Sequence, residues 1–171
     1  MTIATPARAN VLIAANRLYY PLGRVPEFWD WLLHYGEQGQ LKMPVEMVDE
    51  IREGTDDLAD WLSDRTHLNT LLLEEGADVA LVRTVINDGY ATDLTDQEVE
   101  IIGADPFLIS YALQDRENRC IVTTEVSKPT RMRANRHIPD ICEQMHVSWM
   151  DSFGLTRALD FSTSWRARIG A

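Results

Sequence analysis

A short buried-strand signal between two helical segments is the feature that most constrains the fold. Residues Arg119–Thr124 (RCIVTT) are rich in β-branched residues and follow a polar turn, which is typical of a strand buried on both faces. Apolar residues recur at helical spacing before it in Phe107–Leu113 and after it in Ile138–Met145. Two further extended pieces are expected at Leu41–Met43 and Val147–Met150. Strands that alternate with helices predict an α/β fold with a parallel sheet, whose sites lie beyond the carboxyl ends of the strands.

The other expected helices are marked by residues that favour a first turn or cap an N-terminus. These residues are Pro26, Pro44, Asp56 or Asp57, Thr95 with Glu98, and Asp105 with Pro106. A longer helical stretch is expected from Leu68 to Ile86, with a break near Gly76, and a final helix over Ser152–Leu159.

Length and composition indicate one compact domain. The 171 residues, of which 45% are apolar, suit a single domain over residues 1–171. No basic, apolar leader is present and no apolar run approaches about 18 residues, so we expect a cytoplasmic protein without a membrane span. Cys120 and Cys142 form no CxxC pair, which favours two reduced thiols in the core.

A net charge of −11 argues against a broad electrostatic hold on nucleic acid, because phosphate binding needs local positive charge. Any polyanion must therefore meet a local patch. One candidate RNA-binding segment holds Lys128, Arg131, Arg133 and Arg136, with His137 beside them. A solvated basic loop is the alternative interpretation.

Several common chemistries have no support in the motifs. The four histidines have no paired spacing typical of zinc, and no Ser/His/Asp order or glycine-rich phosphate loop is present. The aromatic residues of the first third could stack on RNA bases, but their helical spacing favours the core or a partner interface. They are Tyr19, Tyr20, Phe28, Trp29 and Trp31.

An ordered series of short motifs resembles the PIN domains, and more closely a PIN-like group of bacterial proteins associated with toxin–antitoxin loci. The motifs are ANVLIAANRLYY from Ala9, FWDWL from Phe28, VDEI from Val48, ADPFLISYAL from Ala104, IVTTE from Ile121 and IPDIC from Ile138. The resemblance implies a three-layer domain with a central parallel sheet flanked by helices. It also implies an acidic pocket that binds Mg²⁺ or Mn²⁺ for RNA phosphodiester hydrolysis, and the role of toxin in a type II pair with a cognate antitoxin.

The resemblance assigns the metal ligands and catalytic carboxylates to Glu50, Asp105 and Glu125, with the hydroxyl of Thr123 as a water-orienting group. Hard divalent cations take oxygen ligands, and the bound metal activates water and stabilises charge on the phosphate. Taken singly, each acid has another interpretation: a solvated carboxylate for Glu50, an N-cap for Asp105 and the polar end of a strand for Glu125.

Three weaker candidates for the same pocket are Asn10, Asn16 and Asp140. Either asparagine could be an ordinary cap. Asp140 is equally readable as a first-turn acid that the helix dipole favours.

Arg8 departs from the family pattern. The family's first strand ends in apolar-apolar-Asp-Ala-Asn, and that aspartate is the principal metal ligand, whereas this chain reads Ala7-Arg8-Ala9-Asn10. A guanidinium has donors and no acceptor, so it cannot coordinate a cation. Residues 4–7 (ATPA) are also poor strand formers, and Pro6 cannot donate to a ladder.

Two explanations compete for this departure. Arg8 could lie among the three acids and neutralise them in place of the metal, or residues 1–8 could be a replaced leader. We favour the first, which predicts an impaired endoribonuclease. A non-catalytic module that binds a protein partner or RNA is the alternative function. An antitoxin with basic segments would suit the charge of −11, and a homodimer is left open.

Overall fold

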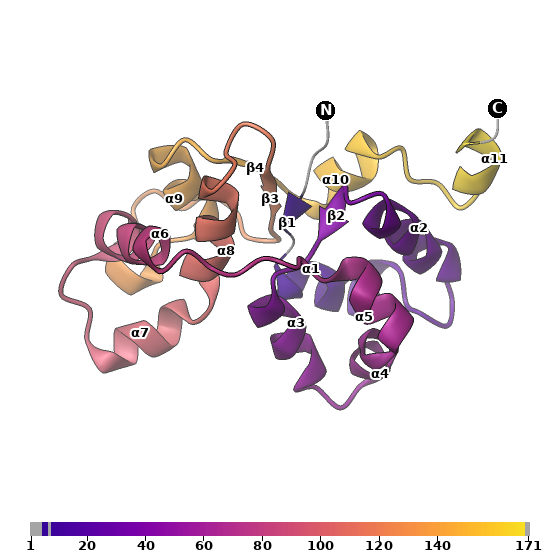
Figure 1. Cartoon of the computed structure of the whole chain (residues 1–171), viewed down its shortest axis with the longest axis horizontal. Helices are drawn as coiled ribbons and strands as arrows, with labels where there is room; N and C mark the ends of the chain where they lie inside the picture. The colour runs from indigo at the N-terminus through magenta and orange to yellow at the C-terminus, as the bar shows by residue number, and fades with distance from the viewer. Residues whose placement is uncertain (1–4, 7, 170–171) are drawn as a thin grey trace.

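The computed structural model describes residues 5–6 and 8–169, and it consists of helices arranged around short parallel strands (Figure 1). The strands are β1 (Thr5–Pro6), β2 (Leu41–Lys42), β3 (Cys120–Val122) and β4 (Ser148–Met150). The described part of the chain contains no helix with the length and apolar character needed to cross a membrane.

The strands form two parallel pairs that one main-chain hydrogen bond joins. β1 pairs with β2 and β3 pairs with β4. The N–H of Arg8, just past β1, donates to the carbonyl oxygen of Val122 in β3 at 3.1 Å. An isolated parallel bridge between Met43 and Leu72 continues the ladder beyond β2. The predicted α/β character, with parallel strands, is confirmed.

Pairing at Thr5–Pro6 corrects the expectation that this segment is unsuited to a strand. The strand is only two residues long, so the missing N–H of a proline removes little from the ladder. Ala4 and Ala7, which belonged to the same expectation, lie outside the described residues.

Helices make up most of the remaining described chain. In the first half they are α1 (Ala9–Ala14), which continues into the π-helical turn η1 (Ala15–Tyr19), α2 (Pro26–Glu37), α3 (Val45–Arg52), α4 (Asp57–Ser63) and α5 (Arg65–Leu71). In the second half they are α6 (Val79–Thr84), which continues into the π-helical turn η2 (Val85–Tyr90), α7 (Asp96–Ile102), α8 (Asp105–Leu113), the 3₁₀ turn η3 (Arg133–Asn135), α9 (Ile138–Gln144), α10 (Ser152–Ala158) and α11 (Trp165–Ile169).

Capping residues explain where several helices start. Asp56 accepts the N–H of Ala59 at the start of α4, and Thr95 with Glu98 forms the predicted capping box before α7. The helical stretch expected over 68–86 is present, and the expected break near Gly76 is confirmed, but the break is longer than a local interruption. Residues 72–78 separate α5 from α6, because the chain pairs with Met43 there and Asp78 caps a new helix.

Large aromatic side chains of α2 are part of the core. Trp29 and Trp31 are buried, and their indole N–H groups donate to the carbonyl oxygens of Tyr20 and Leu159. The predicted core location of the two cysteines is confirmed. Burial raises the pKa of the Cys120 thiol to about 11 and raises that of Cys142 as well.

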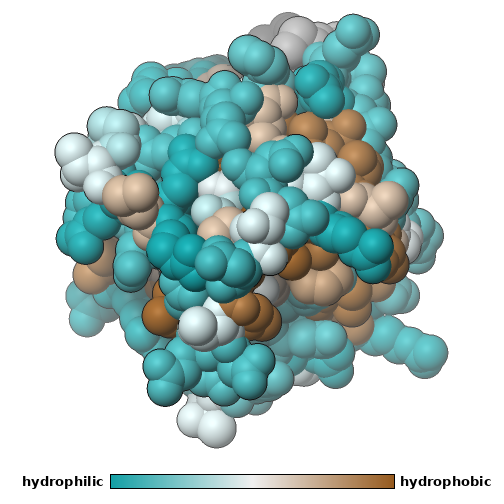
Figure 2. Space-filling view, turned by 90° about the vertical axis from the view of Figure 1, so that its left-hand side faces the viewer, coloured by the Kyte–Doolittle hydropathy of each residue, from teal (hydrophilic) through white to brown (hydrophobic). Residues whose placement is uncertain are grey.

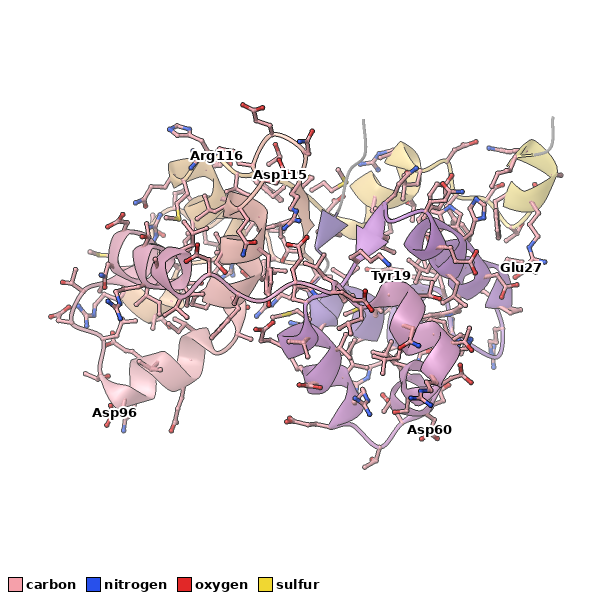
Figure 3. The ribbon with its side chains drawn as sticks, viewed as in Figure 1. Tyr19, Glu27, Asp60, Asp96, Asp115 and Arg116 are labelled. Atoms are coloured by element: carbon pink, nitrogen blue, oxygen red, sulfur yellow. The ribbon has the colours of Figure 1, made fainter. Side chains whose placement is uncertain are left out.

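Charged side chains lie at the periphery. The end of the molecule that α6, α7 and α9 form is mostly hydrophilic, with apolar residues in small groups (Figure 2). Asp60 and Asp96 are exposed and lie at the lower edge of the molecule, away from the strands (Figure 3).

Candidate functional site

Arg8 lies where β1 ends and α1 begins. Its main chain is extended, and its N–H is held by the carbonyl oxygen of Val122 at 3.1 Å. This bond fixes the start of the side chain at the carboxyl end of β1, beside the end of β3. The side chain is 17% exposed, so it is largely withdrawn from water.

The guanidinium of Arg8 binds two acids that come from distant parts of the chain. Its Nη2 donates to Oδ2 of Asp105 at 3.2 Å, and its Nε lies 3.1 Å from Oδ1 of the same carboxylate as an ion pair. Its Nη1 donates to Oε1 of Glu125 at 2.5 Å. Such charge-assisted hydrogen bonds are stronger than those between neutral groups. The structure therefore brings together three of the residues that the sequence selected.

Asp105 directly follows the turn between α7 and α8, which sets its position. α8 begins at Asp105, and the capping position belongs to Ala104, so the N-cap interpretation of Asp105 is wrong. Gly103 ends α7 with φ of 49° and ψ of −127°, a backbone conformation that favours glycine. The carboxylate of Asp105, 13% exposed, is thus free to turn to Arg8.

Glu125 follows β3 and joins Arg8 to a helix start. Its second oxygen, Oε2, accepts the N–H of Ile138 at the first residue of α9, at 2.8 Å. Its own N–H donates to Oγ1 of Thr123 at 3.1 Å, while Thr123 is fully buried and its N–H donates to the carbonyl oxygen of Met150. Thr123 therefore fixes the main chain of Glu125 from the side of β4.

Glu50 is exposed on α3 and lines an acidic pocket together with Arg8 and Asp105. Residues 101–104 form an apolar part of the same lining. The sequence interpretation missed three further carboxylates of this pocket: Glu46, Asp49 and Glu53. Their spacing around Glu50 places them on one face of a helix, and that periodicity was the available signal.

Burial and charge shift the titration of this cluster in opposite directions. Burial raises the pKa of Asp105 to about 7; the positive charge of Arg8 opposes the rise, and Glu125 and Glu50 add to it. Burial acts to lower the pKa of Arg8, but the negative charges of Asp105 and Glu125 outweigh it and the pKa lies above its ordinary value. Arg8 is therefore a permanent cation inside the cluster.

Tyr90 was missed entirely, and no sequence pattern marks it. It ends η2, which packs against both α8 and α9, and its hydroxyl is buried without a hydrogen-bond partner in the described structure. Burial, together with the charges of Asp105 and Glu125, raises the pKa of this hydroxyl. Tyr90 therefore places a neutral hydroxyl near the two carboxylates.

The weaker pocket candidates serve other contacts. Asn16 donates to Asp57 and accepts the N–H of Leu22, which ties η1 to α4. The carboxylate of Asp140 accepts from the Ser127 hydroxyl and the Lys128 N–H, which fixes the loop after β3. Asn10 lies half-buried in α1. Neither asparagine nor Asp140 lines the acidic pocket.

The basic segment after β3 is less available to RNA than the sequence suggested. Arg133 binds Asp93 and Glu98, and Arg136 binds the carbonyl oxygen of Gly89 and the side chain of Gln144. These two guanidiniums anchor the segment to the rest of the molecule. Lys128 and Arg131 have exposed side chains.

Mg²⁺ and Mn²⁺ prefer oxygen ligands, and carboxylate oxygens are such ligands, so the acids themselves suit such an ion. However, no group of three or more His, Cys, Asp or Glu side chains is arranged to hold a metal in residues 5–6 and 8–169. The guanidinium of Arg8 accounts for this, because it lies between Asp105 and Glu125 and offers only donors. The residues present therefore do not fit a divalent cation at this position.

Fold and site together define an α/β protein with a carboxylate-rich pocket in which an internal arginine pairs with Asp105 and Glu125. The chain belongs to the family described as a domain of unknown function, DUF4411, whose model matches residues 7–163. The comparison with curated proteins gave no match, and neither did the comparison with solved structures.

Proposed function

We propose that this chain is a PIN-like endoribonuclease scaffold, the toxin member of a type II toxin–antitoxin pair, whose metal-dependent activity is impaired by Arg8. The observation that carries the proposal is the bonding of Arg8 to both Asp105 and Glu125 at the carboxyl ends of parallel strands. Open α/β sheets bind their ligands at such strand ends. The motif resemblance supplies the proposed substrate, RNA, and the proposed three-layer arrangement of helices around the strands.

The electrostatics support the inhibitory role of Arg8. Two like unit charges about 4 Å apart repel by roughly 4 kcal/mol at an effective dielectric of 20, and a divalent ion is repelled more. Arg8 brings one positive charge to a place where a metal would bring two. It stabilises the acids without offering a ligand or an activated water.

A second candidate is a non-catalytic module that binds a protein partner or RNA. The same salt bridges favour it, because they satisfy the acidic cluster without any metal. The two candidates differ in what happens when the arginine is removed and a carboxylate takes its place.

The decisive variant is Arg8→Asp, which restores the aspartate of the family pattern. We expect Arg8→Asp to cleave RNA in the presence of Mg²⁺ or Mn²⁺ and to arrest growth when expressed, while the unchanged chain does neither. Asp105→Ala in the Arg8→Asp background should abolish both effects. Cleavage of a mixed RNA pool on a denaturing gel, with and without a chelator, is the measurement.

The outcomes separate the candidates cleanly. Metal-dependent cleavage that requires both the Arg8→Asp change and Asp105 supports the impaired nuclease. If a folded Arg8→Asp variant leaves every RNA in the pool intact, the nuclease proposal fails and the binding module is favoured. Cleavage by the unchanged chain at an ordinary enzyme rate would show that Arg8 does not impair the site.

A further inference from the structure

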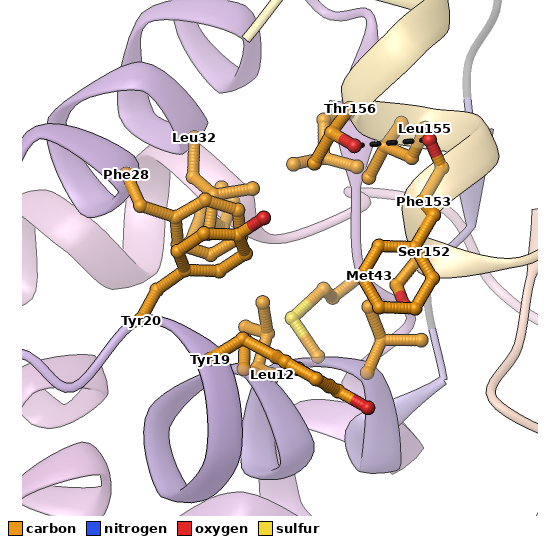
Figure 4. Close-up of a pocket in the computed structure, with 14 residues that line it drawn as sticks. Leu12, Tyr19, Tyr20, Phe28, Leu32, Met43, Ser152, Phe153, Leu155 and Thr156 are labelled. Carbon is orange, nitrogen blue, oxygen red and sulfur yellow. Dashed lines mark hydrogen bonds between the residues drawn. The ribbon is translucent and has the colours of Figure 1, made fainter. Parts of the chain in front are cut away.

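An apolar hollow lies between α1, η1, α2 and α10. Figure 4 shows Tyr20, Phe28 and Leu32 on one side and the residues of α10, including Phe153, on the other. Tyr19 and Phe153 meet edge to face, with ring centroids 5.1 Å apart. The lining contributes almost no polar surface, and the free space inside is only about 10 Å³, so the protein's own side chains nearly fill this hollow.

Large apolar side chains are exposed around a second, neighbouring hollow. Leu18 is 69% exposed, Val126 62%, Tyr19 47% and Phe153 41%. All four line this second hollow, which shares Tyr19 and Phe153 with the first, and Glu125 also lines it. Contiguous apolar surface of this kind marks a contact with another molecule more often than scattered single residues do.

The Glu125–Arg8 ion pair connects the second hollow to the acidic pocket. Glu125 lines the second hollow and binds Arg8, and Arg8 lines the acidic pocket. Arg8 partly neutralises Asp105 and Glu125. Four further carboxylates line that pocket beyond them: Glu46, Asp49, Glu50 and Glu53. The surface is therefore apolar at one end and negatively charged at the other.

We propose that this composite surface binds a short polypeptide segment that carries an aliphatic or aromatic side chain next to lysine or arginine. The apolar side chain enters the second hollow, which has a volume of about 460 Å³ and is lined by Leu18, Tyr19 and Phe153, and the cations face the carboxylates of α3. Complementary charge of this kind guides association and selects partners. The inference rests on the partner half of the proposed function and adds the place and the chemistry of the contact.

Charge separates this occupant from two others. A second copy of the chain brings a further net charge of −11 to an acidic surface, which opposes self-association. RNA brings phosphates to the same carboxylates, without the local cations that phosphate binding needs. A basic, apolar peptide meets both ends of the surface favourably.

The test is a selection of short random peptides on the full-length, unchanged chain, followed by fluorescence anisotropy of the selected sequences. We expect enrichment of peptides that combine an apolar residue with net positive charge. Leu18→Ser and Phe153→Ser should each weaken their binding by about tenfold or more, since truncation of a central apolar contact has an effect of this size. Added salt should weaken it further.

Val79→Ser is the matched control, because Val79 on α6 is 69% exposed, as Leu18 is, and lines neither hollow. We expect its binding to equal that of the unchanged chain. The inference is overturned if the selection enriches nothing or acidic peptides, if Val79→Ser weakens binding as much as Leu18→Ser, or if single-stranded RNA displaces the peptide. Peptide binding is measured without any RNA cleavage, so failure here is distinct from failure of the Arg8→Asp cleavage test.

Discussion

At the residue scale, Arg8 connects the electrostatics of the site to the stability of the fold. Its guanidinium is the cation that holds Asp105, from α8, and Glu125, from the end of β3. The three side chains are 17%, 13% and 22% exposed, so water screens their charges only in part. The loss of one partner leaves the others poorly compensated.

Arg8→Ala should therefore lower the free energy of unfolding by about 1–3 kcal/mol, because two neighbouring carboxylates lose their counter-charge. Urea unfolding followed by circular dichroism measures this change. Arg17→Ala is the control, since the Arg17–Asp56 pair is 67% and 39% exposed and should contribute at most about 0.5 kcal/mol. Equal effects of the two substitutions would contradict the role given to Arg8.

The pH dependence of stability should reveal Asp105. Its pKa is about 7 in the folded protein, against an ordinary value of 3.8, so the folded state holds this proton more tightly than the unfolded state does. The resulting stabilisation is fully present below the ordinary value and is lost as the pH rises through about 7. As the pH falls from about 8 to about 5, the free energy of unfolding of the unchanged chain should therefore rise relative to that of Asp105→Asn.

Urea unfolding of both proteins at several pH values provides this difference directly. A constant difference across the range would mean that Asp105 is ionised in both states and that its folded pKa is not raised, which would contradict this prediction.

At the scale of elements, the turn between α7 and α8 places Asp105. Gly103 has a positive φ of 49°, and a Cβ there would meet nothing nearer than the carbonyl oxygen of Glu100 at 3.8 Å. Substitution at Gly103 therefore acts through backbone strain and not through a clash.

Gly103→Ala should lower the free energy of unfolding by about 1–3 kcal/mol, the usual cost of a strained backbone position. Gly76→Ala is the matched control, because a Cβ at Gly76 would meet no atom within 4 Å and the φ of this residue is not positive. We expect it to be neutral or slightly stabilising. If both variants unfold at the same urea concentration, the turn does not need its glycine.

Some helix boundaries could be predicted from the sequence and others could not. The starts of α4 and α7 were predictable because their signals are local: Asp56 caps one, and Thr95 with Glu98 caps the other. The break between α5 and α6 is longer than predicted, since the pairing of Met43 with Leu72 comes from a distant segment. Apolar periodicity near 68–86 contains no information about that partner.

The site was predictable in outline for a related reason. Asp105 and Glu125 lie in motifs whose order resembles a known family, and the end of a parallel strand is where Glu125 was expected. The binding partners of Arg133, which are Asp93 and Glu98, could not be predicted, because they depend on how η3 packs against α7. For this reason the expected basic patch is weaker in the structure than in the sequence.

At the scale of the whole molecule, the negative charge is unevenly distributed. The chain has a net charge of −11, and five carboxylates line one pocket: Glu46, Asp49, Glu50, Glu53 and Asp105. A single internal arginine lies at that pocket's inner end. We propose that this arginine takes the place of a divalent cation.

Calorimetric titration with Mn²⁺ tests this claim most directly, using the unchanged chain, Arg8→Ala and Arg8→Asp. We predict saturable binding for Arg8→Asp, which should stabilise the fold by about 2.7 kcal/mol when the free metal is at 100 times its Kd. Arg8→Ala should bind more weakly, and the unchanged chain should not bind. Tight binding of Mn²⁺ by the unchanged chain, or no binding by a folded Arg8→Asp variant, would contradict the account.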